Sequence, residues 1–337
     1  MTMQETATPH DSQTGAEPLL DVKGLHVAFD APAGTARILE DVNLAIHSGE
    51  ILGVVGESGS GKSVTAMSII RLLSKPGRVT EGSVIFRNQD LLALNKDQMR
   101  HIRGSEIAMI FQNPRSSLNP VFKIGRTMRE VLKVHEGLKP KEADRRAMEL
   151  LSSVGLGDPA SILKRYPHQV SGGMAQRIMI ALALASRPHL LIADEPTTAL
   201  DVTIQYQIIR LLKQLRDETG LAQIVITHNL GVVAELCDRV AVMYAGSVVE
   251  EAPVVDLFDA PRHPYTKGLL AARAAHASGE RRLQTIPGQV PDLLNRPSGC
   301  AFRTRCPFAA DICATARPPV EDDGSRKIAC HRWKEIA

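Results

Sequence analysis

Residues 51–63 read ILGVVGESGSGKS, and they set the class of fold to which the chain belongs. The apolar run ILGVV predicts a buried strand, and the segment SVTAMSIIRLL from residue 63 onward predicts a helix. Between them, GESGSGKS at 56–63 fits the phosphate-binding pattern G-x-x-x-x-G-K-[ST]. Backbone N–H groups of such a loop, and the N-terminus of the helix after it, surround phosphate oxygens. The stretch therefore predicts a nucleotide-binding α/β fold.

The residues of this phosphate loop have separate expected tasks. The Lys62 ammonium is expected to reach the β- and γ-phosphates, and the Ser63 hydroxyl to ligate Mg²⁺. The predicted nucleotide-binding residues of the loop are Gly56, Glu57, Ser58, Gly59, Ser60, Gly61, Lys62 and Ser63.

A second apolar segment, LLIADE at 190–195, ends in two acidic residues. At the carboxyl end of a parallel strand, Asp194 is placed to hold Mg²⁺. Glu195 follows directly and is placed to polarise the water that attacks the γ-phosphate. An apolar strand that merely stops in a solvated acidic loop is the alternative, and the phosphate loop upstream disfavours it.

The rest of the chain changes pattern several times. Helix and strand signals alternate from residue 171 to 227, which predicts right-handed crossovers and a parallel sheet. Two alternating runs within residues 19–55, separated by a loop DAPAGTA, predict antiparallel strands, and residues 239–252 predict a hairpin. Residues 123–165 show helical periodicity with many charges. Beyond about residue 260 the chain is rich in Pro, Arg and Cys, which predicts a separate appendage.

Composition excludes several classes of protein. Forty basic and 37 acidic residues give a net charge of only +3, which argues against a nucleic-acid partner. No apolar run approaches the roughly 20 residues that span a bilayer. The polar N-terminus lacks the apolar centre of a signal peptide, and five cysteines without a secretion signal indicate a reducing cytoplasm.

SGGMAQR at 171–177 resembles the signature of ABC ATPases, with Val170 where that family has Leu and Met174 where it has Gln. Physically, Ser171 can cap a helix whose first N–H groups are left bare by Gly172 and Gly173. The resemblance implies that this tip contacts the ATP of a second ATPase subunit. An ordinary capped helix is the alternative.

The remaining elements of that family occur in order. Gln112 in IFQNP resembles the Q-loop glutamine that contacts Mg²⁺, and Asp201 in TALD resembles the D-loop that crosses the dimer interface. His228 resembles the switch histidine, so the resemblance implies the catalytic set Glu195, His228 and Lys62. Phe29 is the candidate for stacking on adenine, with a role in the core as the alternative.

The resemblance implies an α/β fold of the ABC-type P-loop NTPase class. Its parts are a parallel-sheet core, an N-terminal antiparallel β subdomain, a helical subdomain and a small Cys-containing appendage. We expect a disordered leader over residues 1–18, the ATPase domain over 19–262 with its helical subdomain at about 113–170, and the appendage over 263–337.

A finer resemblance is to the oligopeptide and dipeptide importers. It is carried by IFQNPRSSLNP, SGGMAQR, DEPTTALDVTIQ, HPYTKGLL at 263–270 and the cysteine-containing tail. It implies ATP hydrolysis that drives two separate permease subunits and uses an extracytoplasmic binding protein, at the cytoplasmic face of the membrane. Importers of nickel, glutathione and antimicrobial peptides share these features, so the solute stays open. A non-transport ABC ATPase acting on a soluble partner is the competing class.

Four of the five cysteines, Cys300, Cys306, Cys313 and Cys330, fall in this tail. Their spacing is not the C-x₂-C of zinc ribbons or bacterial ferredoxins, and spacing alone favours free thiols. A short segment with little apolar core nevertheless needs a staple. Similar tails in peptide-importer ATPases carry a [4Fe–4S] cluster, so the resemblance implies one here, with free thiols or zinc as alternatives. Cys237 is expected simply to be buried.

Overall fold

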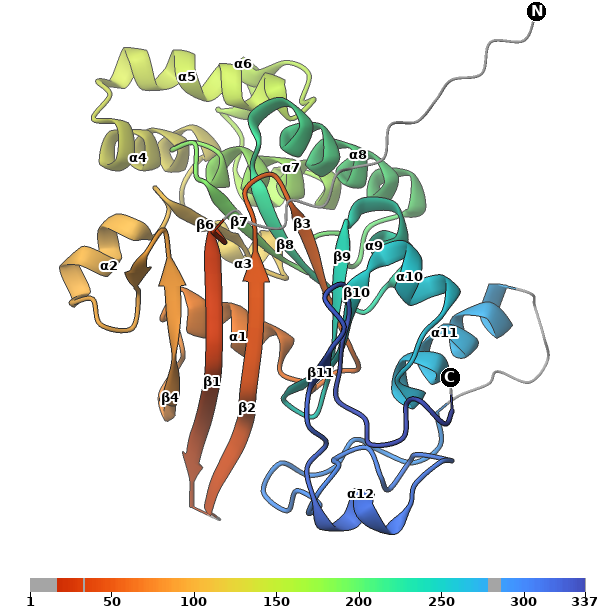
Figure 1. Ribbon diagram of the computed structural model, residues 1–337. Helices are drawn as coiled ribbons and strands as arrows, with labels where there is room; N and C mark the ends of the chain where they lie inside the picture. Colours follow the sequence, from red (N-terminus) through yellow and green to blue (C-terminus); the bar gives the residue numbers. More distant parts are fainter. Residues whose placement is uncertain (1–16, 33, 278–285, 337) are drawn as a thin grey trace, which may run out of the picture.

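The computed structural model describes residues 17–32, 34–277 and 286–336 (Figure 1). The leader predicted over 1–18 therefore falls almost wholly outside the described residues. The strands of the structure form two sheets. The smaller sheet is antiparallel, in the order β2-β1-β4-β5. Its strands are β1 (Leu20–Ala31), β2 (Gly34–Ile46), β4 (Gly77–Phe86) and β5 (Gln89–Asp90).

The larger sheet has eight strands in the order β11-β12-β10-β9-β3-β8-β7-β6. The five strands from β9 to β6 are parallel, and β10, β12 and β11 extend one edge in antiparallel pairing. Its strands are β3 (Ile51–Val55), β6 (Ile107–Ile110), β7 (Leu190–Asp194), β8 (Ala222–Thr227), β9 (Arg239–Tyr244), β10 (Ser247–Pro253), β11 (Glu321–Asp322) and β12 (Lys327–Ile328). The predicted parallel core and the hairpin at 239–252 are thus confirmed.

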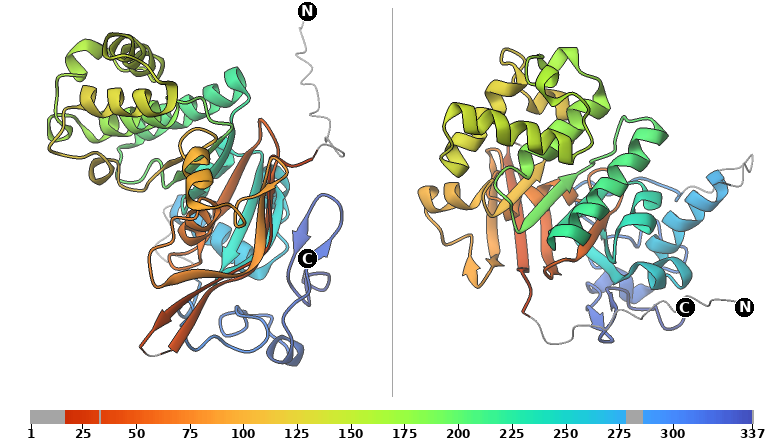
Figure 2. Two further views of the ribbon diagram at one scale, coloured as in Figure 1. Left: turned by 90° about the vertical axis from the view of Figure 1, so that its left-hand side faces the viewer. Right: turned by 90° about the horizontal axis from the view of Figure 1, so that it is seen from above.

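The helices segregate by region. They are α1 (Lys62–Ile69), α2 (Lys96–Ile102), α3 (Pro114–Ser117), α4 (Ile124–Glu136), α5 (Pro140–Ser153), α6 (Pro159–Ile162), the 3₁₀ turn η1 (Pro167–Gln169), α7 (Gly172–Ala183), α8 (Val202–Thr219), α9 (Leu230–Leu236), α10 (Val254–Asp259), α11 (Pro264–Ala277) and α12 (Asp311–Thr315). Residues 113–170 hold α3 to α6 and η1, and Figure 2 shows α4–α6 at the opposite end of the molecule from the C-terminal residues. Among the described residues, none of the helices has both the length and the apolarity needed to cross a membrane.

Strand β3 explains why its sequence is continuously apolar. Ile51 and Val55 pack in one apolar cluster, with residues of α4, α5, α7, α8 and α9. Leu52 and Val54 pack in a second cluster, with residues of α1 and the antiparallel sheet. Because both faces of the strand are covered, no position on it favours a polar side chain. The loop after β3 therefore begins from a strand that is buried on both faces.

The C-terminal segment packs on the main sheet, and the division into an ATPase domain over 19–262 and an appendage over 263–337 stays a prediction. Strand β12 pairs with β10 through Glu250–Ile328 and Glu251–Lys327, so the segment extends the main sheet. Phe302 belongs to the same apolar cluster as Ile51 and Val55 of β3. The Phe302 ring packs against Tyr244 of β9 and Tyr265 of α11. We call residues 286–336 the C-terminal lobe.

Two further predictions need adjustment. The predicted loop DAPAGTA is largely strand, because β1 continues to Ala31 and β2 begins at Gly34. Helix α1 ends at Ile69, short of the predicted segment that runs to Leu73. Arg71 has a positive φ of 54°, a left-handed conformation that does not continue a helix.

Candidate functional site

The phosphate loop lies between β3 and α1 and is pressed against two neighbouring segments. At Gly56, with φ of 154°, an added Cβ would lie 2.2 Å from the Met243 carbonyl oxygen. At Gly61, with φ of 103°, it would lie 2.6 Å from Leu39 Cδ2. Glycine is thus required at both positions by conformation or by space. The loop is shaped by β9 and β2 as much as by its own sequence.

Lys62 lies at the first position of α1 and points back into the loop. Its Nζ donates to the carbonyl oxygens of Gly56 at 2.7 Å and Glu57 at 2.9 Å. Burial lowers the pKa of Lys62, and the nearby carboxylates of Glu195, Asp194 and Glu57 oppose that shift. The ammonium is therefore held at the place where the phosphate-binding pattern requires a positive charge.

Asp194 ends strand β7 and is 4% exposed. Burial raises the pKa of its carboxyl, and a hydrogen bond from the Ser63 hydroxyl opposes that shift. Its Oδ1 is buried and has no hydrogen-bond partner among the described residues. A buried carboxylate oxygen without a donor, beside a hydroxyl, fits a hard cation such as Mg²⁺. Gln112 is exposed just after β6, which pairs with β7 through Ile110–Ala193, so both residues emerge at the same sheet edge.

Glu195 is held at both carboxylate oxygens. Its Oε1 lies 2.7 Å from His228 Nδ1 and accepts from the His228 backbone N–H at 3.1 Å. Its Oε2 accepts from the Thr198 hydroxyl at 2.6 Å. The Glu195 backbone has a positive φ of 51°, a conformation that non-glycine residues rarely adopt and that clusters at functional sites. From the sequence Thr198 was identified only as the first residue of the segment that resembles the D-loop, and the geometry adds its hydroxyl contact with Glu195.

The signature segment begins helix α7 as the sequence predicted. Ser171 Oγ accepts from the Met174 N–H at 3.3 Å, which is the expected N-cap bond. An added Cβ at Gly173 would lie 2.7 Å from Ile204 Cγ2, so the tip packs against α8. Asp201 caps α8 by accepting from the Ile204 N–H at 2.9 Å. The structure thus adds a capping function to Asp201, whose contact across a dimer interface stays a prediction.

Phe29 lies near the end of β1, opposite Ala36 of β2 and Gly77 of β4. Its ring occupies the space that a side chain at Gly77 would need, 2.5 Å from an added Cβ. It packs against the second apolar cluster. These contacts favour its alternative, core role, and stacking on adenine stays a prediction.

The four tail cysteines converge in space. Cys300, Cys306, Cys313 and Cys330 line one small cavity of about 20 Å³ together with Phe302 and Phe308. Burial raises the pKa of Cys300 to about 11 and also raises the pKa values of Cys306 and Cys330. Within the described part of the chain, no three His, Cys, Asp or Glu side chains are arranged to hold a metal ion. Cys237 is buried at the end of α9, as expected.

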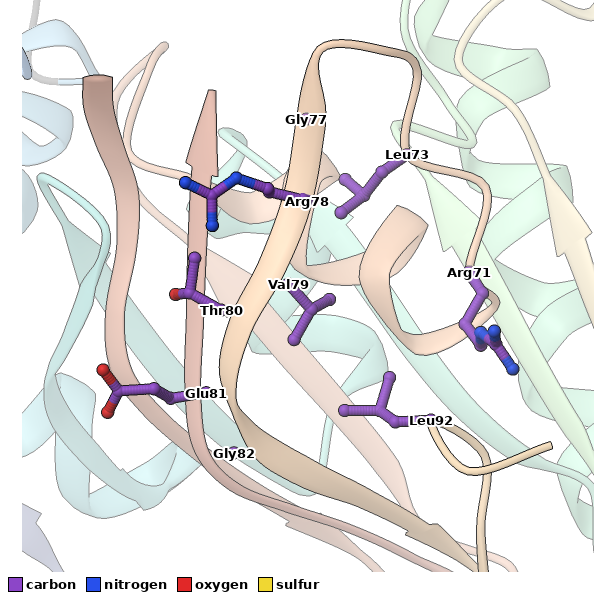
Figure 3. Close-up of a pocket in the computed structure, with 9 residues that line it drawn as sticks. All are labelled: Arg71, Leu73, Gly77, Arg78, Val79, Thr80, Glu81, Gly82 and Leu92. Carbon is purple, nitrogen blue, oxygen red and sulfur yellow. The ribbon is translucent and has the colours of Figure 1, made fainter. Parts of the chain in front are cut away.

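A separate groove of about 430 Å³ runs beside β4 (Figure 3). Leu73, Val79 and Leu92 point toward it, whereas Arg78 and Glu81 point away toward the neighbouring strands. None of the predicted site residues lines this groove. We assign it no role in nucleotide binding.

Comparisons with known proteins agree with this geometry. The family described as ABC transporter matches residues 39–198, and the family described as oligopeptide/dipeptide transporter, C-terminal region, matches residues 249–313. A putative peptide import ATP-binding protein of Brucella ovis is 50% identical, over 95% of this chain and 99% of that protein. The dipeptide transport ATP-binding protein DppD of Haemophilus influenzae is 48% identical, over 93% of this chain and 95% of that protein.

Solved structures show the same fold. The dimeric ATP-binding cassette MJ0796 bound to ADP and Pi is similar with a TM-score of 0.63 and 31% identity, over 70% of this chain and 98% of that chain. The cbiO1 protein of Clostridium perfringens, part of the transporter complex cbiONQ, is similar with a TM-score of 0.62 and 26% identity, over 78% and 100% of the two chains.

Proposed function

Since the chain belongs to the ABC transporter family and is an ATPase of that family, we propose that it powers the import of short peptides. The observation that carries the peptide assignment is the match of residues 249–313 to the oligopeptide/dipeptide transporter C-terminal region. Relatives that align over almost their whole length and are named for peptide or dipeptide transport support it.

The catalytic roles follow from the contacts around Glu195. We propose that Glu195 polarises the attacking water and that His228, hydrogen-bonded to it at 2.7 Å, orients it. Lys62 would offset the negative charge on the phosphoryl group in transfer. Mg²⁺, when bound, supplies further positive charge there, and Ser63, Gln112 and Asp194 are the residues that would hold it. The unpartnered Oδ1 of Asp194 supports this assignment.

The signature tip supports a dimeric arrangement. Ser171, Gly172 and Gly173 begin a helix whose first N–H groups can meet phosphate. The phosphate loop, Lys62 and Asp194 lie together and would serve one nucleotide, so we propose that the tip serves the ATP of a second ATPase subunit. The dimeric form of the similar cassette MJ0796 is consistent with this.

The other partners follow from the importer assignment. We propose that the ATPase pair sits on two integral-membrane permease subunits, peripheral to the cytoplasmic face of the membrane, and that an extracytoplasmic binding protein delivers the solute. Gln112 and the segment after it, residues 113–145, would respond to the state of the permeases. Most of that segment is the helical layer farthest from the C-terminal lobe (Figure 1).

For the four tail cysteines we propose a [4Fe–4S] cluster with a structural role. The cavity that all four cysteines line supports this proposal, because it brings the four thiols together. A zinc site and free thiols are the alternatives. Anaerobic purification followed by iron and sulfide assay tests the cluster, and folded, iron-free protein would refute it.

Uptake tests the transport function. Cells that lack this chain are supplied with wild type or Glu195→Gln and assayed with a labelled short-peptide mixture and, in parallel, labelled nickel. Peptide uptake restored only by wild type is the expected result. Restoration of nickel uptake alone would assign a metal importer, and no change with either solute would remove the peptide assignment while leaving the ATPase family intact.

A further inference from the structure

The C-terminal lobe contacts the phosphate loop directly, through one ion pair. Arg305 Nη1 and Nη2 donate to the two carboxylate oxygens of Glu57 at 2.6 and 3.0 Å. The two residues are 248 positions apart in the sequence. The Arg305 side chain is 4% exposed and that of Glu57 is 29% exposed, so the pair is largely removed from water. Such bidentate, charge-assisted pairs are among the stronger hydrogen-bonded contacts in proteins.

Arg305 is fixed on its far side by the lobe itself. Its Nε donates to the Pro287 carbonyl at 2.9 Å, and its Nη2 donates to the Ile286 carbonyl at 3.1 Å. Its Nη1 also lies 3.5 Å from the Tyr244 hydroxyl. Every nitrogen of the guanidinium therefore has a partner, and the group cannot swing toward another anion without losing several bonds.

The HPYT segment supplies a second contact to the same loop residue. The Glu57 backbone N–H donates to the Tyr265 hydroxyl at 2.8 Å. Tyr265 is fully buried at the start of α11, with its ring 4.7 Å from that of Tyr244 and 5.4 Å from that of Phe302. Its backbone N–H donates to His263 Nδ1 at 3.0 Å, which fixes the conformation of residues 263–265. Both the carboxylate and the N–H of Glu57 are thus held from outside the loop.

Glu57 carries a negative charge within the phosphate loop, and the contacts with Arg305 and Tyr265 compensate and orient it. It is an anion inside a loop that must bind a triphosphate, and its carboxylate is close enough to influence the pKa of Lys62. An unpaired carboxylate there would repel phosphate and compete for the Lys62 ammonium. We propose that Arg305 is a positioning residue for nucleotide binding, which neutralises Glu57 and, with Tyr265, keeps it turned away from the phosphates.

The proposal predicts an asymmetric set of variants. Arg305→Met leaves the Glu57 charge uncompensated, so the dissociation constant for ATP should rise about tenfold. Glu57→Gln should change it by no more than about threefold, since a neutral side chain needs no partner charge. The double variant should return to within about threefold of wild type. Tyr265→Phe, which loses one neutral hydrogen bond, should weaken binding only about threefold.

The test uses the purified full chain with Mg²⁺ and a non-hydrolysable ATP analogue, titrated by calorimetry. Arg262→Met is the matched control, because Arg262 also pairs with a lobe carboxylate, that of Asp323, and does not belong to the phosphate-loop contacts. Thermal unfolding without nucleotide and the iron content of each variant are measured alongside. In ATPase assays, Arg305→Met should raise KM for ATP and leave kcat within about twofold, as expected when binding is lost without a change in chemistry.

Rescue of Arg305→Met by Glu57→Gln, with Arg262→Met unchanged, supports the proposal. Unchanged ATP affinity in Arg305→Met would overturn it, even if the unfolding temperature falls, because the pair would then serve stability alone. A double variant as weak as Arg305→Met would also overturn it. Binding is measured on the chain itself, so a failure of the peptide assignment leaves these outcomes unaffected.

Discussion

The end of strand β7 and the C-terminal lobe each contain a buried charged side chain. The two side chains differ in how completely they are hydrogen-bonded. Asp194 is 4% exposed, and its Oδ1 has no hydrogen-bond partner among the described residues. The Arg305 side chain is 4% exposed and bonded at every nitrogen. A buried carboxylate oxygen without a donor is costly, and it is expected where a ligand completes it. The end of β7 is therefore suited to bind and release a ligand, whereas Arg305 in the C-terminal lobe is held by fixed partners.

The largest expected effect comes from Glu195, which follows Asp194 at the end of β7. Glu195→Gln keeps the shape of the side chain but removes the charge that polarises water, so ATP turnover should fall about 10²- to 10³-fold. ATP should then remain bound in a closed pair of subunits, detectable by gel filtration with ATP and Mg²⁺.

The control for this prediction is Glu218→Gln, an exposed carboxylate on α8. Its turnover should match wild type. Unchanged turnover in Glu195→Gln would show that another group activates the water.

Replacing a cysteine tests whether the proposed cluster stabilises the C-terminal lobe. Cys306→Ser should abolish bound iron and cost on the order of 2 kcal/mol or more, as losses of metal sites do. The unfolding midpoint should fall by about 5 °C in a chain of this size. Iron assay and calorimetry measure both effects. Cys237→Ala, at a buried cysteine outside the cavity, should keep its iron, and iron retained in Cys306→Ser would remove Cys306 from the ligand set.

The sequence predicts these two regions to different extents, for a physical reason. Lys62, Asp194 and Glu195 lie at strand and helix ends, where a local pattern determines both the element and the side chain's position. The parallel core and the hairpin at 239–252 were predicted in the same way. Arg305 and Tyr265 act on a loop about 200 or more positions away, and no local pattern records such a contact. Strand β6 and helix α11 were also not predicted from the sequence.

Acid titration tests the burial of His263, the residue just before α11. Burial lowers the pKa of His263 to about 3. An unfolded chain would protonate this imidazole near pH 6.5, so between these two values the unfolded state binds the extra proton. The contribution of His263 to stability is therefore complete above pH 6.5 and lost as the pH falls toward 3. From pH 6.5 to 5 the loss should be about 2 kcal/mol.

Denaturant unfolding of wild type and His263→Gln at pH 7 and pH 5 checks this prediction. Glutamine does not titrate, so the decrease in unfolding free energy between the two pH values should be smaller in the variant by about 2 kcal/mol. His168→Gln, at an exposed histidine stacked on Tyr166, should keep the wild-type decrease. Equal pH dependence in His263→Gln and wild type would mean that His263 titrates normally in the folded protein.

The smallest expected effect separates orientation from charge at the catalytic carboxylate. Thr198→Val preserves the shape of the side chain and removes the hydroxyl that donates to Glu195 Oε2 at 2.6 Å. His228 still holds Oε1, so Glu195 keeps its charge and one of its two anchors. We expect kcat to fall about tenfold with KM for ATP within about twofold, because the lost bond positions the base rather than the nucleotide. Thr203→Val, at an exposed threonine on α8, is the matched control. A raised KM with unchanged kcat would instead place Thr198 among the groups that bind nucleotide.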